Sequence, residues 1–234
     1  MAKNKLYRWA EMEGYNNVLQ PAFEDVFRKD YLLKGRWKED FFRNNNPITL
    51  ELGCGKGEYT VAMARSFPER NFLGVDIKGA RMWKGAKEAH NDKLHNVGFI
   101  RTRIELIESF FSKGEISEIW ITFPDPQIKK RRNKKRLTAS RFLNTYNNFL
   151  VNDGLVHLKT DSIELYSYTN RLLLYNNIIP EFATDNLYSG SIENELLNIK
   201  THYELLFLKE GKNITYTRFK PGNRELKELP EDGK

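Results

Sequence analysis

The feature that most constrains the fold is a short apolar run that leads through a glycine-rich turn into a helix. Ile48–Leu52 predicts a buried strand, and Gly53-Cys54-Gly55-Lys56-Gly57 follows it directly. Glu58–Phe67 predicts a helix that ends before Pro68. Glycines let the backbone approach a ligand closely, so this stretch predicts a nucleotide-binding strand–turn–helix unit. The alternative is a tight turn without a ligand.

An acid at the end of the next strand strengthens the nucleotide interpretation. Asn71–Asp76 predicts that strand, and Asp76 lies nineteen residues after Gly57. An acid at about this spacing can hold ribose hydroxyls. The alternative for Asp76 is an N-cap for a helix over Ala80–His90. The turn lacks the third glycine of a dinucleotide-binding loop, since Glu58 stands there, and no Gly-Lys-Ser/Thr follows.

Strands and helices alternate along the rest of the chain. Further strands are predicted over Val97–Arg101, Glu118–Phe123, Leu155–Lys159, Ile178–Thr184 and Ile214–Phe219, and helices over Ile104–Phe111, Leu137–Leu150 and Ile163–Tyr175. This alternation predicts one α/β domain with a mostly parallel sheet and helices on both faces. The glycine turn, Asp76, Asp125 and Asp161 all follow predicted strands, so we expect them along one rim of the sheet.

Local signals refine this outline. Pro180 places the 178–184 strand near a sheet edge, Thr138 is a candidate helix cap, and Asp153-Gly154 predicts a turn. Thr201-x-x-Glu204 has the spacing of a capping box that opens a helix.

Three segments are expected: an N-terminal arm over 1–46, a main domain over 47–219, and a loose polar tail over 220–234. The arm includes a helix near Trp37–Arg43. Its aromatic residues are interpreted as anchors that hold it to the core: Tyr7, Trp9, Tyr15, Phe23, Phe27, Tyr31 and Trp37. The alternative is that they stack on bases.

The positive charge of the chain is concentrated in one block. Lys129–Arg136 holds seven cations in eight residues, and without them 31 Lys and Arg balance 31 Asp and Glu. The block directly follows Asp125, an acid between two prolines at the end of a predicted strand. This arrangement favours an enzyme that acts on RNA. The alternatives are that the basic run is only a solvated surface segment, and that Asp125 only stabilises its own turn.

The remaining sequence properties limit the setting. Cys54 is the single cysteine, so no internal disulfide can form, and a reducing, cytoplasmic setting is expected. No apolar stretch is long enough to span a membrane, and residues 1–8 lack the apolar core of a signal peptide.

Five motifs together resemble known methyltransferases. Glu51-Leu-Gly-Cys-Gly-Lys-Gly57 and Gly74-Val-Asp-Ile77 are similar to the first two cofactor motifs of class I S-adenosylmethionine-dependent methyltransferases. Phe123-Pro-Asp-Pro126 with its basic run, Lys159-Thr-Asp161 and Thr201-His-Tyr-Glu204 resemble the bacterial tRNA (guanine-N7)-methyltransferase family. The resemblance covers about residues 47–219. It implies a Rossmann-like fold with seven strands, the last one antiparallel.

The resemblance implies roles for individual residues. The predicted cofactor-binding residues are Glu51, Gly53, Gly55, Gly57, Asp76, Arg103, Ile104 and Asp125. Asp125 is also the predicted catalytic acid. The predicted substrate-binding residues are Lys129, Asp161, Thr201, His202, Tyr203 and Glu204, and those expected on tRNA phosphates are Arg131, Arg132, Asn133, Lys134, Lys135 and Arg136. The implied cofactor is S-adenosylmethionine, with no metal, and the implied partner is tRNA, with no obligate protein partner. The implied target is guanine at position 46, in the variable loop.

The chain departs from the family pattern at three places. Gln127-Ile128 stand where the family has Trp-Pro, Arg103 stands where an acid is usual, and Leu206 replaces a basic residue. Backbone groups at Arg103 and Ile104 can substitute for the acid on the adenine side. Because the glycines and Asp125 remain, we interpret the departures as variation within an active lineage.

The chemistry of guanine N7 is compatible with this set of residues. N7 carries an in-plane lone pair, so methylation needs alignment of N7 with the methyl and sulfur atoms and no general base. The product base is positively charged, and a nearby carboxylate such as Asp125 stabilises that charge as it develops. Asp161 or Glu204 can accept hydrogen bonds from the ring N–H and amino group of guanine, which adenine lacks.

Three other functions are considered. The first is methylation of another RNA or of an exocyclic amine, but the Asn/Asp-Pro-Pro-aromatic loop of such enzymes is absent. The second is a non-catalytic RNA-binding protein, which the intact glycines and Asp76 disfavour. The third is a nicotinamide dehydrogenase, which Glu58 disfavours.

Overall fold

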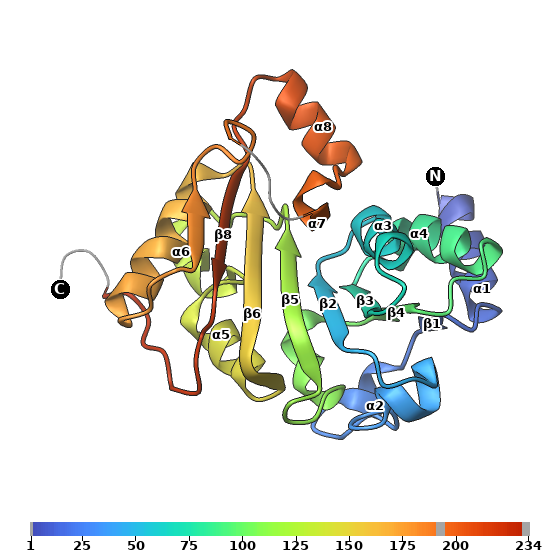
Figure 1. The fold of residues 1–234 in the computed structure, drawn as a ribbon. Coiled ribbons are helices and arrows are strands. Elements are labelled where there is room, and N and C mark those ends of the chain that lie inside the picture. The colour runs from blue at the N-terminus through green and yellow to red at the C-terminus, as the bar shows by residue number, and fades with distance from the viewer. Residues whose placement is uncertain (1, 191–194, 231–234) are drawn as a thin grey trace. The chain divides into compact units, whose positions relative to one another are not determined.

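The structure is a computed structural model that describes residues 2–190 and 195–230. The chain divides into two compact units, Met1–Ser117 and Glu118–Lys234. Figure 1 shows the elements of both units along the chain, coloured from the N-terminus to the C-terminus.

The strands of the first unit are parallel and have the order β1-β4-β3-β2. They are β1 (Val18–Leu19), β2 (Ile48–Leu52), β3 (Asn71–Asp76) and β4 (Val97–Arg101). Leu50 lies opposite Leu73, which lies opposite Gly98. Every residue of β2 is buried, which explains why four of its five side chains are β-branched or leucine, with Glu51 as the exception. The predicted bounds of β2, β3 and β4 are confirmed.

The helices of the first unit follow the predicted alternation. They are α3 (Glu58–Ser66), α4 (Gly79–Asn91), a 3₁₀ helix over Ile104–Ser109 and the short α2 (Phe23–Val26). A π-helical turn spans Trp37–Phe42, where a helix was predicted. The first loop of the sheet meets α4 closely: a Cβ on Gly85 would lie 2.7 Å from the carbonyl oxygen of Lys56 and 2.9 Å from the Cα of Gly57. Small residues on both sides therefore permit this contact.

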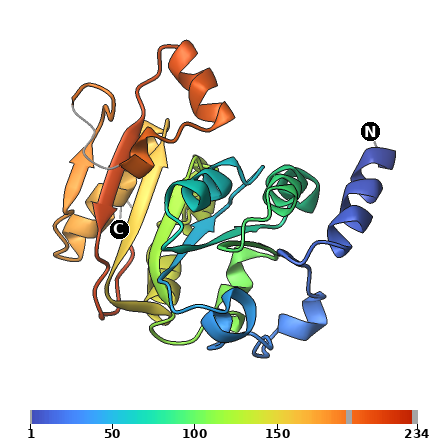
Figure 2. The ribbon, with the colours of Figure 1, turned by 45° about the vertical axis from the view of Figure 1, so that its right-hand side comes forward.

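The N-terminal arm begins with a helix that the sequence did not reveal, α1 (Ala2–Glu13). It lies beside α4, as Figure 2 shows for the blue helix and its green neighbour. Glu11 joins them by accepting hydrogen bonds from Trp83 Nε1 at 2.6 Å and Lys87 Nζ at 2.8 Å. Because these links are polar, the helix shows little of the apolar periodicity by which helices are recognised.

The predicted aromatic anchors fall into two groups. Trp37 is fully buried, and its Nε1 donates to the carbonyl of Phe110 at 2.7 Å. Tyr15 stacks on His90, Tyr31 packs against Phe110, and the guanidinium of Arg101 lies 4.3 Å from the Trp9 ring. The anchor interpretation is confirmed for these four. It is wrong for Tyr7, Phe23 and Phe27, which are 62%, 48% and 44% exposed.

The strands of the second unit have the order β5-β6-β8-β7. They are β5 (Ile116–Thr122), β6 (Leu150–Thr160), β7 (Phe182–Thr184) and β8 (Thr215–Phe219). β8 is antiparallel to both β6 and β7, which confirms the antiparallel last strand and the edge position of β7. Among the described residues the two units hold four strands each, one more in total than predicted, because the arm contributes β1.

Two local predictions in the second unit are wrong. Thr138 does not cap a helix: Ala139 is the N-cap, and Thr138 is buried with its hydroxyl 2.7 Å from that of Thr169. The chain does not leave the sheet at Asp153-Gly154 either. Asp153 adopts a left-handed conformation with φ of 62°, yet β6 continues through it. Its short polar side chain tolerates that conformation within the strand.

The helices of the second unit are α5 (Ser140–Asn147), α6 (Ile163–Tyr175), α7 (Glu195–Asn198) and α8 (His202–Lys209). A 3₁₀ helix covers Lys130–Lys135. In Figure 1, α5 and α6 lie behind the strands. The core of this unit includes Leu143, Phe149 and Leu172, which are all fully buried.

The C-terminal tail is held by specific contacts, so the expectation of a loose tail is wrong for its described part. Leu226 is buried, and its backbone N–H donates to Asn144 Oδ1 at 2.8 Å. Glu228 accepts hydrogen bonds from Ser140 Oγ at 2.9 Å and Tyr168 Oη at 2.7 Å. Residues 231–234 of the predicted tail lie outside the described residues.

Within the described ranges, no helix has both the length and the apolar character needed to cross a membrane.

Candidate active site

The glycine turn of the first unit presents open backbone at two of its three glycines. Gly53, Gly55 and Gly57 all have positive φ, a conformation that other residues adopt only at a cost. A Cβ on Gly53 would meet nothing within 4 Å, whereas one on Gly57 would lie 2.7 Å from the ring of Phe99. Gly57 is therefore required for packing, while Gly53 and Gly55 leave space beside the backbone for a ligand.

Asp76 is fixed by the same turn. Its Oδ2 accepts a hydrogen bond from Gly55 N at 2.9 Å, and its Oδ1 accepts one from Lys78 N at 2.7 Å. The N-cap of α4 is Lys78, so the capping alternative for Asp76 is wrong. Each carboxylate oxygen retains a further lone pair, so Asp76 can accept hydrogen bonds from a ligand while the turn holds it in place.

Glu51 and Cys54 place negative charge and a thiol beneath the turn. Glu51 is buried at the end of β2, and its carboxylate accepts a hydrogen bond from the hydroxyl of Thr60 on α3. Cys54 is buried, and burial, followed by the charges of Glu51 and Asp76, raises the pKa of its thiol. The thiol therefore stays neutral, which excludes it as a nucleophile at neutral pH.

Arg103 and Ile104 lie at the same edge as the glycine turn and Asp76. Arg101 at the end of β4 is in register with Asp76, and Thr102 N donates to Asp76 O at 3.2 Å. Arg103 is exposed and Ile104 half-buried where the 3₁₀ helix begins. The first unit thus brings the predicted cofactor groups other than Asp125 together at the carboxyl ends of three parallel strands.

In the second unit, Asp125 lies in a tight, irregular loop after β5. Phe123 and Gln127 have positive φ values of 47° and 49°, and Gln127 N donates to Asp125 Oδ1 at 3.0 Å. Phe123 N donates to the carbonyl of Lys159 at 2.8 Å, which fixes the loop to the end of β6. Asp125 therefore helps to hold its own loop, as the turn interpretation expects. Its carboxylate is nevertheless exposed, so the structural role leaves it accessible to a substrate.

The basic segment, defined as Lys129–Arg136, separates into exposed and buried cations. Lys129, Arg131, Arg132, Lys134 and Lys135 are exposed, as expected for groups that contact RNA phosphates. Arg136 differs, because its side chain is only 4% exposed. Its Nε donates to the carbonyl of Pro126 at 3.0 Å, its Nη2 pairs with Glu164 at 2.8 Å, and its guanidinium lies 4.3 Å from the Tyr168 ring. Its charge is used within the protein, so we assign Arg136 a structural role.

Asp161 directly follows β6, and its capping alternative is also wrong. Ser162 is the N-cap of α6, with its Oγ accepting from Leu165 N at 3.2 Å. Asp161 is half-buried, and Lys212 Nζ lies 3.7 Å from its Oδ2. It therefore remains available for hydrogen bonds to a base.

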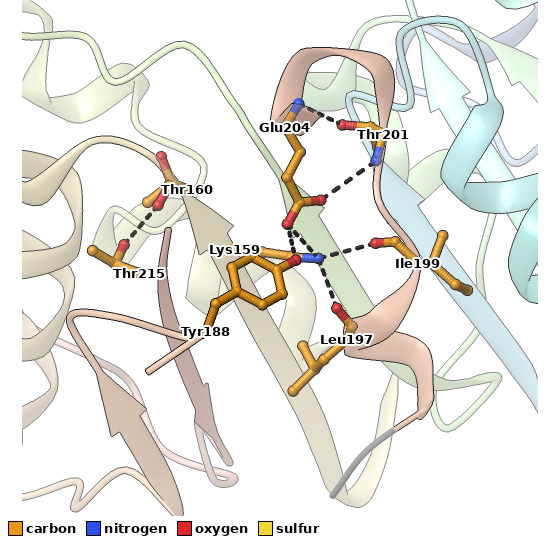
Figure 3. Close-up of polar contacts among 8 residues, drawn as sticks. All are labelled: Lys159, Thr160, Tyr188, Leu197, Ile199, Thr201, Glu204 and Thr215. Carbon is orange, nitrogen blue, oxygen red and sulfur yellow. Dashed lines mark hydrogen bonds and ion pairs between the residues drawn. The ribbon is translucent and has the colours of Figure 1, made fainter. Parts of the chain in front are cut away.

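The predicted Thr201–Glu204 segment forms a capping box around a buried ion pair (Figure 3). Thr201 Oγ1 accepts from Glu204 N at 3.2 Å, and Glu204 Oε2 accepts from Thr201 N at 3.4 Å. Glu204 and Lys159 are both fully buried, with Lys159 Nζ 2.9 Å from Glu204 Oε1. That oxygen also accepts a hydrogen bond from the hydroxyl of Tyr188. The capping alternative is thus confirmed.

Lys159 is the residue that the sequence predictions did not assign. Its Nζ also donates to the carbonyls of Leu197 and Ile199, at 3.1 and 3.0 Å, so one ammonium joins β6 to the segment before α8. Burial lowers the pKa of Lys159, and the charge of Glu204 opposes that shift. The available signal was a lysine at the end of an apolar buried strand, because such a cation needs an acidic partner. By contrast, His202 and Tyr203 are exposed at the start of α8.

No group of three or more His, Cys, Asp or Glu side chains that could hold a metal ion occurs within residues 2–190 and 195–230.

The fold is that of class I methyltransferases, with the glycine turn at the carboxyl end of β2. The chain is similar to the solved structure of the 16S rRNA methyltransferase KamB, with a TM-score of 0.59 and 13% identity, covering 77% of this chain and 90% of that chain. A solved antibiotic-related methyltransferase gives a TM-score of 0.59 and 15% identity, over 83% and 96% of the two chains. At such low identity the likeness establishes the fold alone, and it confirms the predicted Rossmann-like arrangement.

Similarity in sequence identifies the family more narrowly than the fold does. Residues 45–217 match the family model described as "Putative methyltransferase". The tRNA (guanine-N(7)-)-methyltransferase of Christiangramia forsetii is 53% identical over 220 residues, 94% of this chain and 98% of that protein. The enzyme of the same name from Bacteroides fragilis is 48% identical over 229 residues, 97% and 90% of the two chains. The chain belongs to the tRNA (guanine-N(7)-)-methyltransferase family.

Proposed function

We propose that this chain transfers the methyl group of S-adenosylmethionine to N7 of a guanine in tRNA, at position 46 of the variable loop. The observation that carries the proposal is similarity over nearly the whole length to proteins named for this reaction. A tRNA substrate is consistent with a cytoplasmic enzyme, as expected from the sequence.

The residues of the first unit fit the cofactor. S-adenosylmethionine supplies an electrophilic methyl group on a sulfonium sulfur. Gly53 and Gly55 offer backbone with open space beside it, and Asp76 offers acceptors for ribose hydroxyls. We assign Glu51 to the amino-acid part, and the backbone at Arg103 and Ile104 to the adenine side. A neutral Cys54 does not compete for the methyl group, because the thiolate is the nucleophilic form.

The reaction at N7 requires position and charge stabilisation. The N7 lone pair attacks the methyl carbon as the bond to sulfur breaks, and no proton moves. Holding the two reactants in line converts a bimolecular step into an effectively unimolecular one. The exposed carboxylate of Asp125 then stabilises the positive charge that develops on the base. The hydrogen bond from Gln127 N fixes this carboxylate before substrate arrives.

The second unit supplies the groups assigned to the substrate. Asp161 is available to accept hydrogen bonds from the Watson–Crick edge of guanine, and the exposed rings of His202 and Tyr203 are available for stacking. Thr201 and Glu204 hold the start of α8 in place, so we assign Glu204 a positioning role. The exposed cations bind tRNA phosphates: Lys129, Arg131, Arg132, Lys134 and Lys135.

The proposal is tested by incubating the purified protein with labelled S-adenosylmethionine and unmodified tRNA, then digesting the tRNA to nucleosides. The expected product is N7-methylguanosine, and a second tRNA with position 46 changed from guanine to adenine is expected to accept no label. Methylation at another atom would overturn the assigned reaction. Methylation of the changed tRNA at N7 would overturn the assigned position.

A further inference from the structure

The basic segment continues into a cleft that includes an arginine not assigned so far. A cleft of about 550 Å³ opens in the second unit between the basic segment, α6 and the C-terminal tail. Its cationic lining includes Arg131 and Lys134 from the basic segment and Arg171 from α6. None of the sequence motifs points to Arg171.

Three cations of this cleft, unlike Arg136, are not neutralised by an ion pair among the described residues. Arg131, Lys134 and Arg171 are exposed, and no ion pair involves them within the described part of the chain. The two acids of the cleft have partners: Glu164 pairs with Arg136, and Glu228 accepts hydrogen bonds from Ser140 and Tyr168. The cleft therefore carries positive charge that suits an anionic ligand.

The floor of the cleft is connected to the loop that holds Asp125. Buried Arg136 lines the cleft and donates to the carbonyl of Pro126, the residue after Asp125. Ile128, from the same loop, lines the cleft as well. The cleft therefore adjoins the loop that carries Asp125.

The cleft also contains an acceptor that has no donor. Asn133 lines it, and the side-chain oxygen of Asn133 is buried without a hydrogen-bond partner in the described part of the molecule. Buried polar atoms are normally satisfied, so this oxygen lacks a donor that a ligand or a water molecule can supply. A ribose 2′-hydroxyl is such a donor, and it distinguishes RNA from DNA.

We infer that this cleft binds the ribose–phosphate backbone of tRNA next to the target guanine, with Arg171 on a phosphate and Asn133 on a 2′-hydroxyl. The inference rests on the proposed function for the identity of the RNA. The charged groups and the orphan acceptor are independent of it.

The charge part is tested with Arg171→Gln, and with Arg141→Gln as the matched control. Arg141 is an exposed arginine on α5 of the same unit that does not line the cleft. Affinity for unmodified tRNA is measured by fluorescence anisotropy over a series of KCl concentrations. We expect Arg171→Gln to weaken binding about three- to tenfold and to lower the salt slope by about 1, with Arg141→Gln unchanged. Equal slopes for the two variants would overturn the inference.

The 2′-hydroxyl part is tested with Asn133→Ala and two tRNAs, one all-ribose and one with 2′-deoxy nucleotides flanking the target guanine. Wild type is expected to prefer the all-ribose tRNA, and Asn133→Ala to lose that preference. An unchanged preference would overturn the assignment of Asn133. In each variant, S-adenosylmethionine affinity by calorimetry checks that the fold is intact.

The failure of this inference and the failure of the proposed function give different results. N7-methylguanosine formed normally by Arg171→Gln, with wild-type tRNA affinity and salt slope, would remove the cleft and leave the proposed function. Reduced tRNA affinity and slope in Arg171→Gln, without any methylguanosine from wild type, would support the cleft and overturn the proposed function.

Discussion

The two units build their candidate sites from different features of the polypeptide. In the first unit, backbone conformation forms the site: three glycines at positive φ, with Asp76 held by two backbone N–H groups. In the second unit, side chains form it. A buried lysine–glutamate pair positions α8, and a buried arginine braces the loop that carries Asp125.

This difference predicts two kinds of mutational sensitivity. A site formed by backbone conformation loses ligand binding or stability when a substitution adds an atom that fills the site or strains φ. The polar side chains of such a site contribute less to folding. A site made of buried charges fails when one partner is removed, because the other is left uncompensated.

Lys159→Met is expected to lower the free energy of unfolding by about 3–5 kcal/mol, because it leaves the buried Glu204 carboxylate without its cation. Adding Glu204→Gln should recover more than half of that loss. Lys212→Met is the control, since its side chain is 46% exposed and its pairs with Asp161 and Glu210 should contribute less than about 1 kcal/mol. Denaturant unfolding measures all four proteins. If the double variant recovered no stability, the proposed difference in mutational sensitivity between the two units would be wrong.

Asp125→Asn is expected to lower turnover about 10²- to 10³-fold while the affinities for tRNA and S-adenosylmethionine stay near wild type. The amide keeps the acceptor for Gln127 N, so the loop is preserved and only the charge is lost. Asp153→Asn is the control, an acid whose side chain is 83% exposed in β6. Single-turnover methylation separates chemistry from binding. Turnover within threefold of wild type would remove Asp125 from the mechanism.

Two substitutions in the glycine turn test different properties: Gly57→Ala tests packing, and Gly53→Ala tests access of a ligand to the backbone. Both glycines have positive φ, so each substitution should cost about 1–2 kcal/mol of stability. Gly57→Ala should cost about 1–3 kcal/mol more, because its methyl group meets the Phe99 ring and α4. Gly53→Ala should instead lose most of its S-adenosylmethionine affinity. Thermal unfolding and calorimetry give the two readouts, and equal stability losses would contradict this division.

Tyr188→Phe should cost about 0.5–1.5 kcal/mol near neutral pH, through the lost hydrogen bond to Glu204. Burial, and then the bond to Glu204, raises the pKa of Tyr188 above that of the unfolded chain, about 10. Stability from this group is therefore complete below pH 10 and is lost as the pH rises further. Wild type should lose stability faster than Tyr188→Phe above pH 10. Parallel curves from pH 9 to 11 would contradict the prediction.

The first unit was largely predictable because its signals are local. The apolar runs of β2, β3 and β4 and the glycines between them identify strands and turn without tertiary information. The missing helix, α1, buries only Met12 among residues 5–13 and is joined to α4 through polar contacts of Glu11, so little buried apolar surface marks it in the sequence.

The second unit was less predictable because its decisive contacts join residues distant in sequence. Glu204 matches a capping box, but its pairing with Lys159 spans 45 positions and leaves no local pattern. Arg136 belongs to a basic run, and only the fold shows that Glu164 and Pro126 remove it from solvent. The departure at Gln127 was visible, but the positive φ at this residue was not.

Cys54 gives the glycine turn a built-in chemical reporter. It is the only cysteine of the chain, it lies between Gly53 and Gly55, and its thiol is buried with a raised pKa. Alkylating reagents attack the thiolate, so the folded turn protects this position, and modification proceeds through states in which the turn has opened. The rate at which the unmodified protein is labelled therefore measures how often its glycine turn opens, without any introduced probe.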